Sequence, residues 1–177
     1  MARIIIVDEN DTPIGAKPRE ALTADDCYRV AAIWITKPGG DILMAQRALT
    51  KKHAPGRWST AVEGTVEEGE EYFTNAVKEA VEEIGLMVNP KRLEKGPLMK
   101  IQTPERKRFC QWFFYVTDMP TDVMEIDKEE VAQVRWLSQD VVRKMLETEP
   151  KLLVESAPQW LGQLLRKPEA AATMQKE

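Results

Sequence analysis

The sequence has very few of the residues that build multi-histidine metal sites or disulfide frameworks. It contains one histidine, His53, and two cysteines, Cys27 and Cys110, among 177 residues. A single histidine excludes a site that needs several imidazole ligands. The two cysteines lie far apart and lack metal-ligand spacing, which favours reduced thiols over a stabilising disulfide. We therefore expect a cytoplasmic protein.

Basic charge and long apolar runs are also scarce. The net charge is −4 at pH 7, whereas a protein that binds nucleic acid or a membrane surface needs a basic face. The first apolar run, IIIV in MARIIIVDEN, ends at acidic residues and is too short for a signal peptide or a membrane span. No nucleic-acid or membrane partner is expected.

Length and composition suit one globular domain. Hydrophobic residues make up 43% of the 177 residues, which is enough to bury a real core. We expect a single domain over residues 1–166. Residues 167–177 are expected to form a flexible C-terminal tail, because PEAAATMQKE offers little to bury.

Short apolar runs bounded by turn residues predict more strands than helices. The runs YRVAAIWIT and ILMAQRA flank a Pro-Gly-Gly turn and predict a hairpin. Further strands are expected in IIIV, WSTAVEG, VAQVRWL and, as a pair, in KGPLMKIQTPERKRFCQWFFYVTDM. Ser138 is a good N-cap for a helix over SQDVVRKMLE, and APQWLGQLLRK predicts another. This order favours an α/β (α+β) sandwich with helices packed on a mixed sheet.

A helix rich in glutamate is expected within Gly64 to Leu86, GTVEEGEEYFTNAVKEAVEEIGL. Helical spacing groups six apolar residues into a stripe that should face a sheet: Phe73, Ala76, Val77, Ala80, Val81 and Ile84. Glu79, Glu82 and Glu83 share a sector beside this stripe, where their like charges repel one another. A hard cation such as Mg²⁺ would turn that repulsion into attraction. The cluster indicates a metal site, and a solvated charged face is the alternative.

The same stretch resembles the Nudix box, which is a glycine, five residues, a glutamate, seven residues, then Arg-Glu-aliphatic-x-Glu-Glu-x-Gly-aliphatic. The matching positions are Gly64, Glu70, Glu79, Glu82, Glu83, Gly85 and Leu86. Two positions depart: Lys78 replaces the arginine, and Ala80 is a small aliphatic residue. Lysine keeps the positive charge but loses the planar fork of arginine. The resemblance implies a Nudix α/β/α sandwich that hydrolyses a diphosphate linked to another moiety, usually within a nucleotide.

The resemblance also implies a cofactor, Mg²⁺ or Mn²⁺, and roles for individual residues. Glu79 and Glu83 would be the main metal ligands, and Glu82 would be a further ligand or the general base. The Gly64 carbonyl would complete the protein ligands.

Other residues would support the helix or hold the substrate. The resemblance implies an ion pair between Glu70 and Lys78. Two basic groups could bind the phosphates of a small diphosphate substrate, with solvated loops as the alternative: Lys52, Arg57, Arg106 and Arg108. Homodimers are common in the family, so a homodimer is possible.

Two other functions fit the same fold. The N-terminal half, including RALTKKHAPGRWSTAVEG, resembles isopentenyl diphosphate isomerase. That enzyme uses a cysteine before the box glycine and several histidine ligands, whereas here Glu63 precedes Gly64 and His53 is the only histidine. The third function is a regulatory Nudix-fold module that binds nucleotide without turnover. The lysine at position 78 favours this weakly, and the retained glutamates weigh against it.

Overall fold

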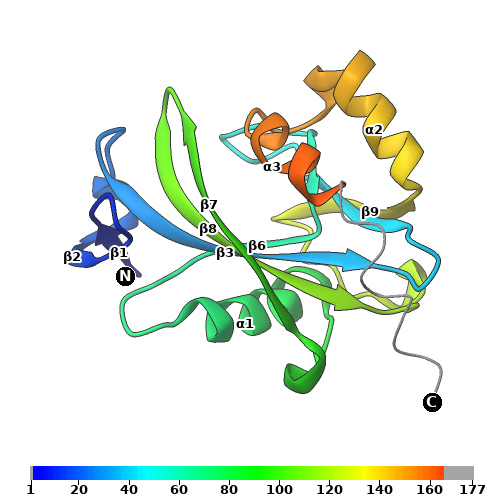
Figure 1. Cartoon of the computed structure of the whole chain (residues 1–177), viewed down its shortest axis with the longest axis horizontal. Coiled ribbons are helices and arrows are strands. Elements are labelled where there is room, and N and C mark those ends of the chain that lie inside the picture. The colour runs from blue at the N-terminus through cyan, green and yellow to red at the C-terminus, as the bar shows by residue number, and fades with distance from the viewer. Residues whose placement is uncertain (1, 166–177) are drawn as a thin grey trace.

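A mixed sheet of nine strands separates two layers of helices (Figure 1). The computed structural model describes residues 2–165, so the tail expected over 167–177 lies outside the described residues. The strands are β1 (Arg3–Val7), β2 (Pro13–Pro18), β3 (Cys27–Thr36), β4 (Ile42–Arg47), β5 (Trp58–Thr60), β6 (Val62–Thr65), β7 (Glu94–Thr103), β8 (Arg106–Val116) and β9 (Val131–Leu137). The helices are α1 (Tyr72–Ile84), α2 (Gln139–Thr148) and α3 (Ala157–Leu164). None of these helices is long and apolar enough to cross a membrane.

The long strand β3 organises the sheet. It pairs in parallel with β8, from Cys27 opposite Lys107 to Thr36 opposite Val116, and antiparallel with β1, β4 and β6. Strand β4 also pairs with β5 and β9, and β7 forms a hairpin with β8. The hairpin predicted across the Pro-Gly-Gly turn is confirmed, because β3 and β4 pair antiparallel next to it.

Each face of the sheet has its own hydrophobic core. On one face α1 buries Ala76, Ala80 and Ile84. On the other face Trp160 of α3 packs against Trp34 of β3 and Trp112 of β8, with ring centroids no more than 6.3 Å apart, and Val142 of α2 lies in the same core. The predicted sandwich of helices on a mixed sheet is therefore confirmed (Figure 1).

The buried face of α1 is narrower than its apolar pattern predicts. Ala76, Ala80 and Ile84 are fully buried, but Phe73 is 37% exposed and Val81 is 47% exposed. The polar Asn75 is fully buried instead. Its side-chain nitrogen donates to the Thr65 carbonyl on β6 and to the Glu70 carboxylate. The helix is thus turned so that the row Asn75, Glu79, Glu83 approaches the sheet.

The N-terminal hairpin is attached to the core by a charged cluster. Asp11, in the β1–β2 turn, accepts hydrogen bonds from Arg29 Nε at 2.8 Å and from the Tyr72 hydroxyl at 3.0 Å. The Arg29 and Asp11 side chains are only 15% and 13% exposed. Burial and the charge of Asp11 raise the pKa of Tyr72, so its hydroxyl stays a donor. These contacts join the hairpin to β3 and to the first turn of α1.

We expect Asp11→Ala to lower the free energy of unfolding by about 2–4 kcal/mol, because it leaves a largely buried arginine without its partner. Urea unfolding curves would measure the loss. Part of it would come from the left-handed backbone of Asp11, φ 62°, and Asp11→Asn should avoid that part because asparagine tolerates this conformation. The control is Asp25→Ala, whose fully exposed carboxylate lies 3.7 Å from Lys107. Equal unfolding midpoints for Asp11→Ala and the control would contradict a structural role for the cluster.

Candidate active site

The side chain of Glu79 packs directly against Gly64. Glu79 is on α1 and Gly64 is on β6, which pairs with the central strand β3. A Cβ atom at Gly64 would overlap the Cγ and carboxylate of Glu79. Glycine is therefore required here for close approach, not for an unusual backbone conformation. Burial raises the pKa of the Glu79 carboxyl.

Glu83, one turn further along α1, is held by the backbone of β6. Its Oε2 accepts a hydrogen bond from the Glu63 N–H at 3.0 Å. Burial raises the pKa of Glu83 well above its usual value, and the nearby carboxylates of Glu79, Glu63 and Glu130 raise it further. No lysine or arginine within residues 2–165 forms an ion pair with Glu83. A bound cation would therefore be the partner that the ionised Glu83 carboxylate lacks.

Lys78 and Glu70 form the ion pair that the resemblance implied, with Lys78 Nζ 2.7 Å from Glu70 Oε1. The other oxygen of Glu70 accepts from the Glu67 N–H and from Asn75 Nδ2. Burial would raise the pKa of Glu70, but the bond from Lys78 and the other two bonds outweigh it and lower that pKa. Lys78 Nζ is also 3.8 Å from Glu79. The pair therefore connects the start of the helix to Glu79.

Glu82 departs from the expected arrangement because it lies on the exposed side of α1, whereas Glu79 and Glu83 are partly buried. Of the three glutamates expected to lie together, Glu79 and Glu83 are therefore turned toward the sheet, whereas Glu82 is exposed to solvent. The charge of Glu82 still contributes to the raised pKa of Glu79.

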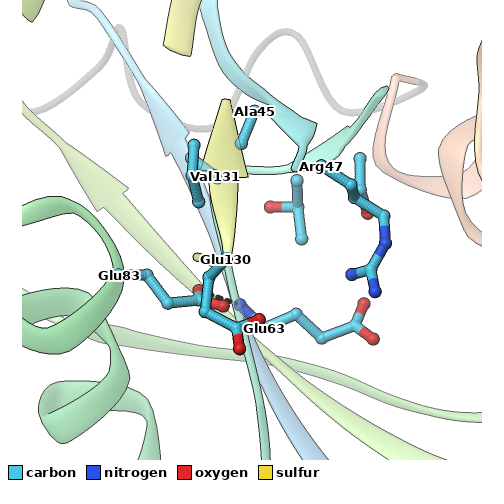
Figure 2. Close-up of a pocket in the computed structure, with 9 residues that line it drawn as sticks. Ala45, Arg47, Glu63, Glu83, Glu130 and Val131 are labelled. Carbon is cyan, nitrogen blue, oxygen red and sulfur yellow. Dashed lines mark hydrogen bonds between the residues drawn. The ribbon is translucent and has the colours of Figure 1, made fainter. Parts of the chain in front are cut away.

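Glu130 joins the site from a distant part of the sequence. A small cavity of about 30 Å³ is lined by Glu63, Glu83, Glu130 and Arg47, among others. Figure 2 shows Glu83 turned toward the Glu63 backbone, with Glu130 beside them. Lys51 Nζ lies 2.6 Å from the Glu130 carboxylate. We call this cavity the carboxylate pocket. Sequence reasoning missed Glu130, because only the pairing of β4 with β9 brings it here.

The oxygen donors of this site suit a hard divalent cation better than a soft one. The described residues contain no group of three or more His, Cys, Asp or Glu side chains arranged as a complete metal site. Mg²⁺ does not require one, since it is commonly bound through one or two carboxylates and takes its remaining ligands from water and substrate phosphates. The partly buried pair Glu79 and Glu83 fits this mode, since Glu79 has only the 3.8 Å contact with Lys78 and Glu83 forms no ion pair within residues 2–165.

A larger cleft of about 420 Å³ opens next to the carboxylate pocket. All four basic residues expected to bind substrate line it: Lys52, Arg57, Arg106 and Arg108. They come from the β4–β5 loop and from the β7–β8 hairpin, and residues 154–156 close a further side. We call this the basic cleft. It shares Arg47, Ser59 and Glu63 with the carboxylate pocket, so the two form one continuous site.

Arg108 differs from the other three basic residues because it is buried, with 8% of its surface exposed. One of its terminal nitrogens lies 3.2 Å from Glu63 Oε1 and donates to Ser156 Oγ at 3.3 Å. Glu63 therefore contacts both regions: its backbone N–H binds Glu83, and its carboxylate binds Arg108. The sequence did not predict this link.

The basic cleft contains the sole histidine of the chain, but not as part of a metal centre. His53 is exposed, and its Nδ1 lies 3.6 Å from Glu105. Glu63 directly precedes Gly64, where an isomerase would need its cysteine. The site therefore lacks the cysteine and the several histidine ligands that an isomerase uses.

Comparison with known proteins agrees with this geometry. Residues 27–157 match the NUDIX domain. A relative described as an uncharacterised Nudix hydrolase of Pseudomonas aeruginosa is 31% identical over 132 residues, covering 74% of this chain and 75% of its own. An isopentenyl-diphosphate Δ-isomerase of Cutibacterium acnes is 26% identical and covers 85% of this chain and 80% of its own. A prenyl-diphosphate phosphatase of Methanosarcina mazei is 26% identical, covering 81% and 84%. The likeness to isomerases thus extends beyond the N-terminal half.

Solved structures show the same fold. A Deinococcus radiodurans protein superposes with a TM-score of 0.70 at 21% identity, covering 93% of this chain and 97% of its own. A bifunctional NMN adenylyltransferase/ADP-ribose pyrophosphatase of Francisella tularensis, solved with AMP and a manganese ion, gives a TM-score of 0.59 at 17% identity. That match covers 77% of this chain and 40% of the larger enzyme.

Proposed function

Because the chain belongs to the Nudix family of pyrophosphohydrolases, we propose that it hydrolyses the diphosphate bond of a small compound, using Mg²⁺ or Mn²⁺. The substrate is a nucleoside diphosphate linked to another moiety, or a similar small diphosphate. The observation that carries this proposal is the close pair Glu79 and Glu83, of which Glu83 has no ion-pair partner within residues 2–165, beside a cleft of cationic side chains. Diphosphate is the ligand class that needs both a bound cation and basic side chains.

In the proposed reaction water attacks one phosphorus atom, and the bond from that phosphorus to the bridging oxygen breaks. The bridging oxygen leaves with the other phosphoryl group, and the proton of the attacking water passes to a base. Glu79, Glu83 and the Gly64 carbonyl are the proposed ligands of the cation, with Glu82 as a further ligand or base. Glu130 is a second candidate for the base, because it lines the carboxylate pocket with Glu83. The cation would neutralise phosphate charge and make the water a better nucleophile.

The basic cleft is proposed to hold the part of the substrate beyond the reacting phosphorus. Arginine and lysine side chains there would form charge-assisted hydrogen bonds to phosphate oxygens. Arg108 is fixed by Glu63 and Ser156 before any ligand arrives, so it loses little side-chain freedom on binding.

The proposal is tested with purified protein, Mg²⁺ and a panel of nucleotides, dinucleotides, nucleotide sugars and isopentenyl diphosphate. Released phosphate or pyrophosphate would be measured, and mass spectrometry would detect an isomerised product. Hydrolysis of one compound class is the expected result. Isomerised isopentenyl diphosphate would favour the isomerase. Tight binding of one compound without turnover would favour the regulatory module.

Lys78→Arg should retain or raise the hydrolytic rate. The longer, forked guanidinium can donate to Glu70 and Glu79 together, whereas Lys78 Nζ lies 2.7 Å from the first and 3.8 Å from the second. Lys78→Met should reduce kcat by roughly 10–100-fold, the size of effect seen when a supporting contact to a metal ligand is lost. Steady-state kinetics of both variants would measure this. A large fall in Lys78→Arg would show that the ion pair does not position Glu79.

Two further predictions concern compartment and assembly. We propose a cytoplasmic enzyme, which is supported by the two free cysteines, Cys27 and the buried Cys110. A homodimer stays a prediction, and sedimentation velocity would measure the mass in solution.

A further inference from the structure

The basic cleft carries more positive charge than its neighbours balance. Its lining includes Arg47, Lys52, Arg57, Arg106 and Arg108 against three glutamates, Glu63, Glu105 and Glu155. The whole chain, in contrast, has a net charge of −4. Within residues 2–165, the side chains of Lys52, Arg57 and Arg106 form no ion pair. Three unpaired cations around one concave surface indicate an anionic ligand.

Arg108 adds a fixed charge to the cleft. Only 8% of its surface is exposed, and its Nε has no hydrogen-bond partner within the described chain. Burying a guanidinium with an unsatisfied N–H is costly unless an anion compensates it. Glu63 supplies only part of this compensation, through a single contact at 3.2 Å. The cleft is therefore built around a cation that a bound anion would stabilise.

The cleft also lacks the surface that a nucleobase or an isoprenoid chain would use. Within residues 2–165, no Phe, Tyr or Trp lines the cleft, and its apolar lining residues are Ala54, Pro55 and Val154. Trp58 adjoins Ser59 on β5, but side chains alternate along a strand and the Trp58 ring packs under Arg135 instead. Among the described residues a base would find no Phe, Tyr or Trp ring to stack on, only the exposed His53 and arginine side chains, and an apolar chain would desolvate charged groups.

We propose that the basic cleft binds a second phosphoryl group, so that the substrate is a compact, polar, non-nucleoside diphosphate phosphorylated at its other end. This inference rests on the proposed function. The diphosphate would lie at the end of the basic cleft that borders the small carboxylate pocket, near the shared residues Arg47, Ser59 and Glu63, and the distal phosphate would reach Arg57 and Arg106. A cleft of about 420 Å³ is large enough for a phosphorylated sugar, since ligand sites start near 300 Å³. Hydrolysis of 5-phosphoribosyl 1-diphosphate at the diphosphate bond would consume one water and give ribose 1,5-bisphosphate and phosphate.

The test compares kcat/KM for 5-phosphoribosyl 1-diphosphate with that for ADP-ribose and for isopentenyl diphosphate. We expect the wild-type protein to prefer the phosphorylated sugar by at least about tenfold. Arg106→Met should reduce that preference by about tenfold or more, mainly through KM, because one charge-assisted hydrogen bond is lost. Lys107→Met is the matched control, since Lys107 is the next residue on β8 but faces Asp25 outside the cleft, and it should keep the preference. Equal preference in Arg106→Met and wild type, or faster turnover of ADP-ribose or isopentenyl diphosphate, would overturn the proposal.

Binding separates failure of this inference from failure of the proposed function. Calorimetry with ribose 5-phosphate measures binding to the basic cleft without any turnover. We expect binding to wild type and at least about tenfold weaker binding to Arg106→Met. Absence of hydrolysis across all compounds would count against the hydrolase alone, whereas absence of ribose 5-phosphate binding would overturn the cleft proposal even if hydrolysis occurs.

Discussion

Glu83→Gln is expected to lower kcat by about a thousandfold or more at saturating Mg²⁺. The change keeps the size of the side chain and can keep the hydrogen bond from the Glu63 N–H. It removes a negative charge, and a hard cation is bound chiefly by charged oxygens. Loss of the cation's contribution to the transition state costs several kcal/mol, and each 1.36 kcal/mol is about a tenfold change in rate. Steady-state kinetics with the substrate identified by the panel would measure the fall.

The same variant should be at least as stable as wild type without metal, which separates a functional role from a structural one. Burial raises the pKa of Glu83 in the folded protein well above its usual value. At a pH between the pKa of Glu83 in the unfolded chain and its pKa in the folded protein, the native state therefore binds more protons than the unfolded state. Wild-type stability therefore decreases as pH rises through this window, and the full penalty is present above it. Glutamine has no such penalty. Thermal unfolding in EDTA at low and neutral pH should show that the melting temperature of the variant, relative to that of wild type, increases as pH rises.

Two other glutamate variants make this prediction specific. Glu147→Gln changes an exposed residue of α2 and should leave activity and the pH dependence of stability as they are. Glu82→Gln should reduce activity less than Glu83→Gln, because Glu82 is exposed and Glu83 is held against β6. Full activity in Glu83→Gln would remove the metal-site hypothesis. A metal-free variant that unfolds far below wild type would mean that Glu83 is chiefly structural.

Local pattern was enough to predict most of the fold. Pro-Gly-Gly between two apolar runs predicted the β3–β4 hairpin, and Ser138 accepts the hydrogen bond from the Val141 N–H that an N-cap should accept. The box spacing placed Glu79 and Glu83 on one side of α1. It did not show that Asn75 would be buried, because the partners of its side-chain nitrogen, Thr65 and Glu70, lie outside the helix. Periodicity treats an asparagine as outward-facing, and a specific hydrogen bond reversed that.

The rest of the site depends on contacts between distant segments. Glu130 lies 47 residues after Glu83 in the sequence, and the pairing of β9 with β4 brings it to the carboxylate pocket. Arg57 and Arg106 appeared in separate basic groups, yet the β4–β5 loop and the β7–β8 hairpin place both in one cleft. Neither spacing nor composition carries that information, because both properties are local to the chain.

Gly64→Ala is expected to lower kcat by about a hundredfold while the protein stays folded. The added methyl group would overlap Glu79 Cγ and its carboxylate, so either the Glu79 side chain moves or α1 shifts away from β6. The side chain is the softer of the two, because Ala76, Ala80 and Ile84 hold the helix against the sheet. A displacement of about 1 Å in a group that orients the reaction can cost about a hundredfold in rate.

The glycine of β2 provides the matched control for this prediction. Gly15 is exposed, and a Cβ there would meet no atom within 4 Å, so Gly15→Ala should leave kcat within about a factor of two, as expected for a surface change away from special features. Thermal unfolding of both variants would check that the fold is kept, and Mn²⁺ binding followed by electron paramagnetic resonance would read the metal site directly. Weaker Mn²⁺ binding in Gly64→Ala alone is the expected result. Wild-type turnover and Mn²⁺ binding in Gly64→Ala would show that the position of Glu79 against β6 does not matter for catalysis, and Glu83 would then have to hold the cation without it.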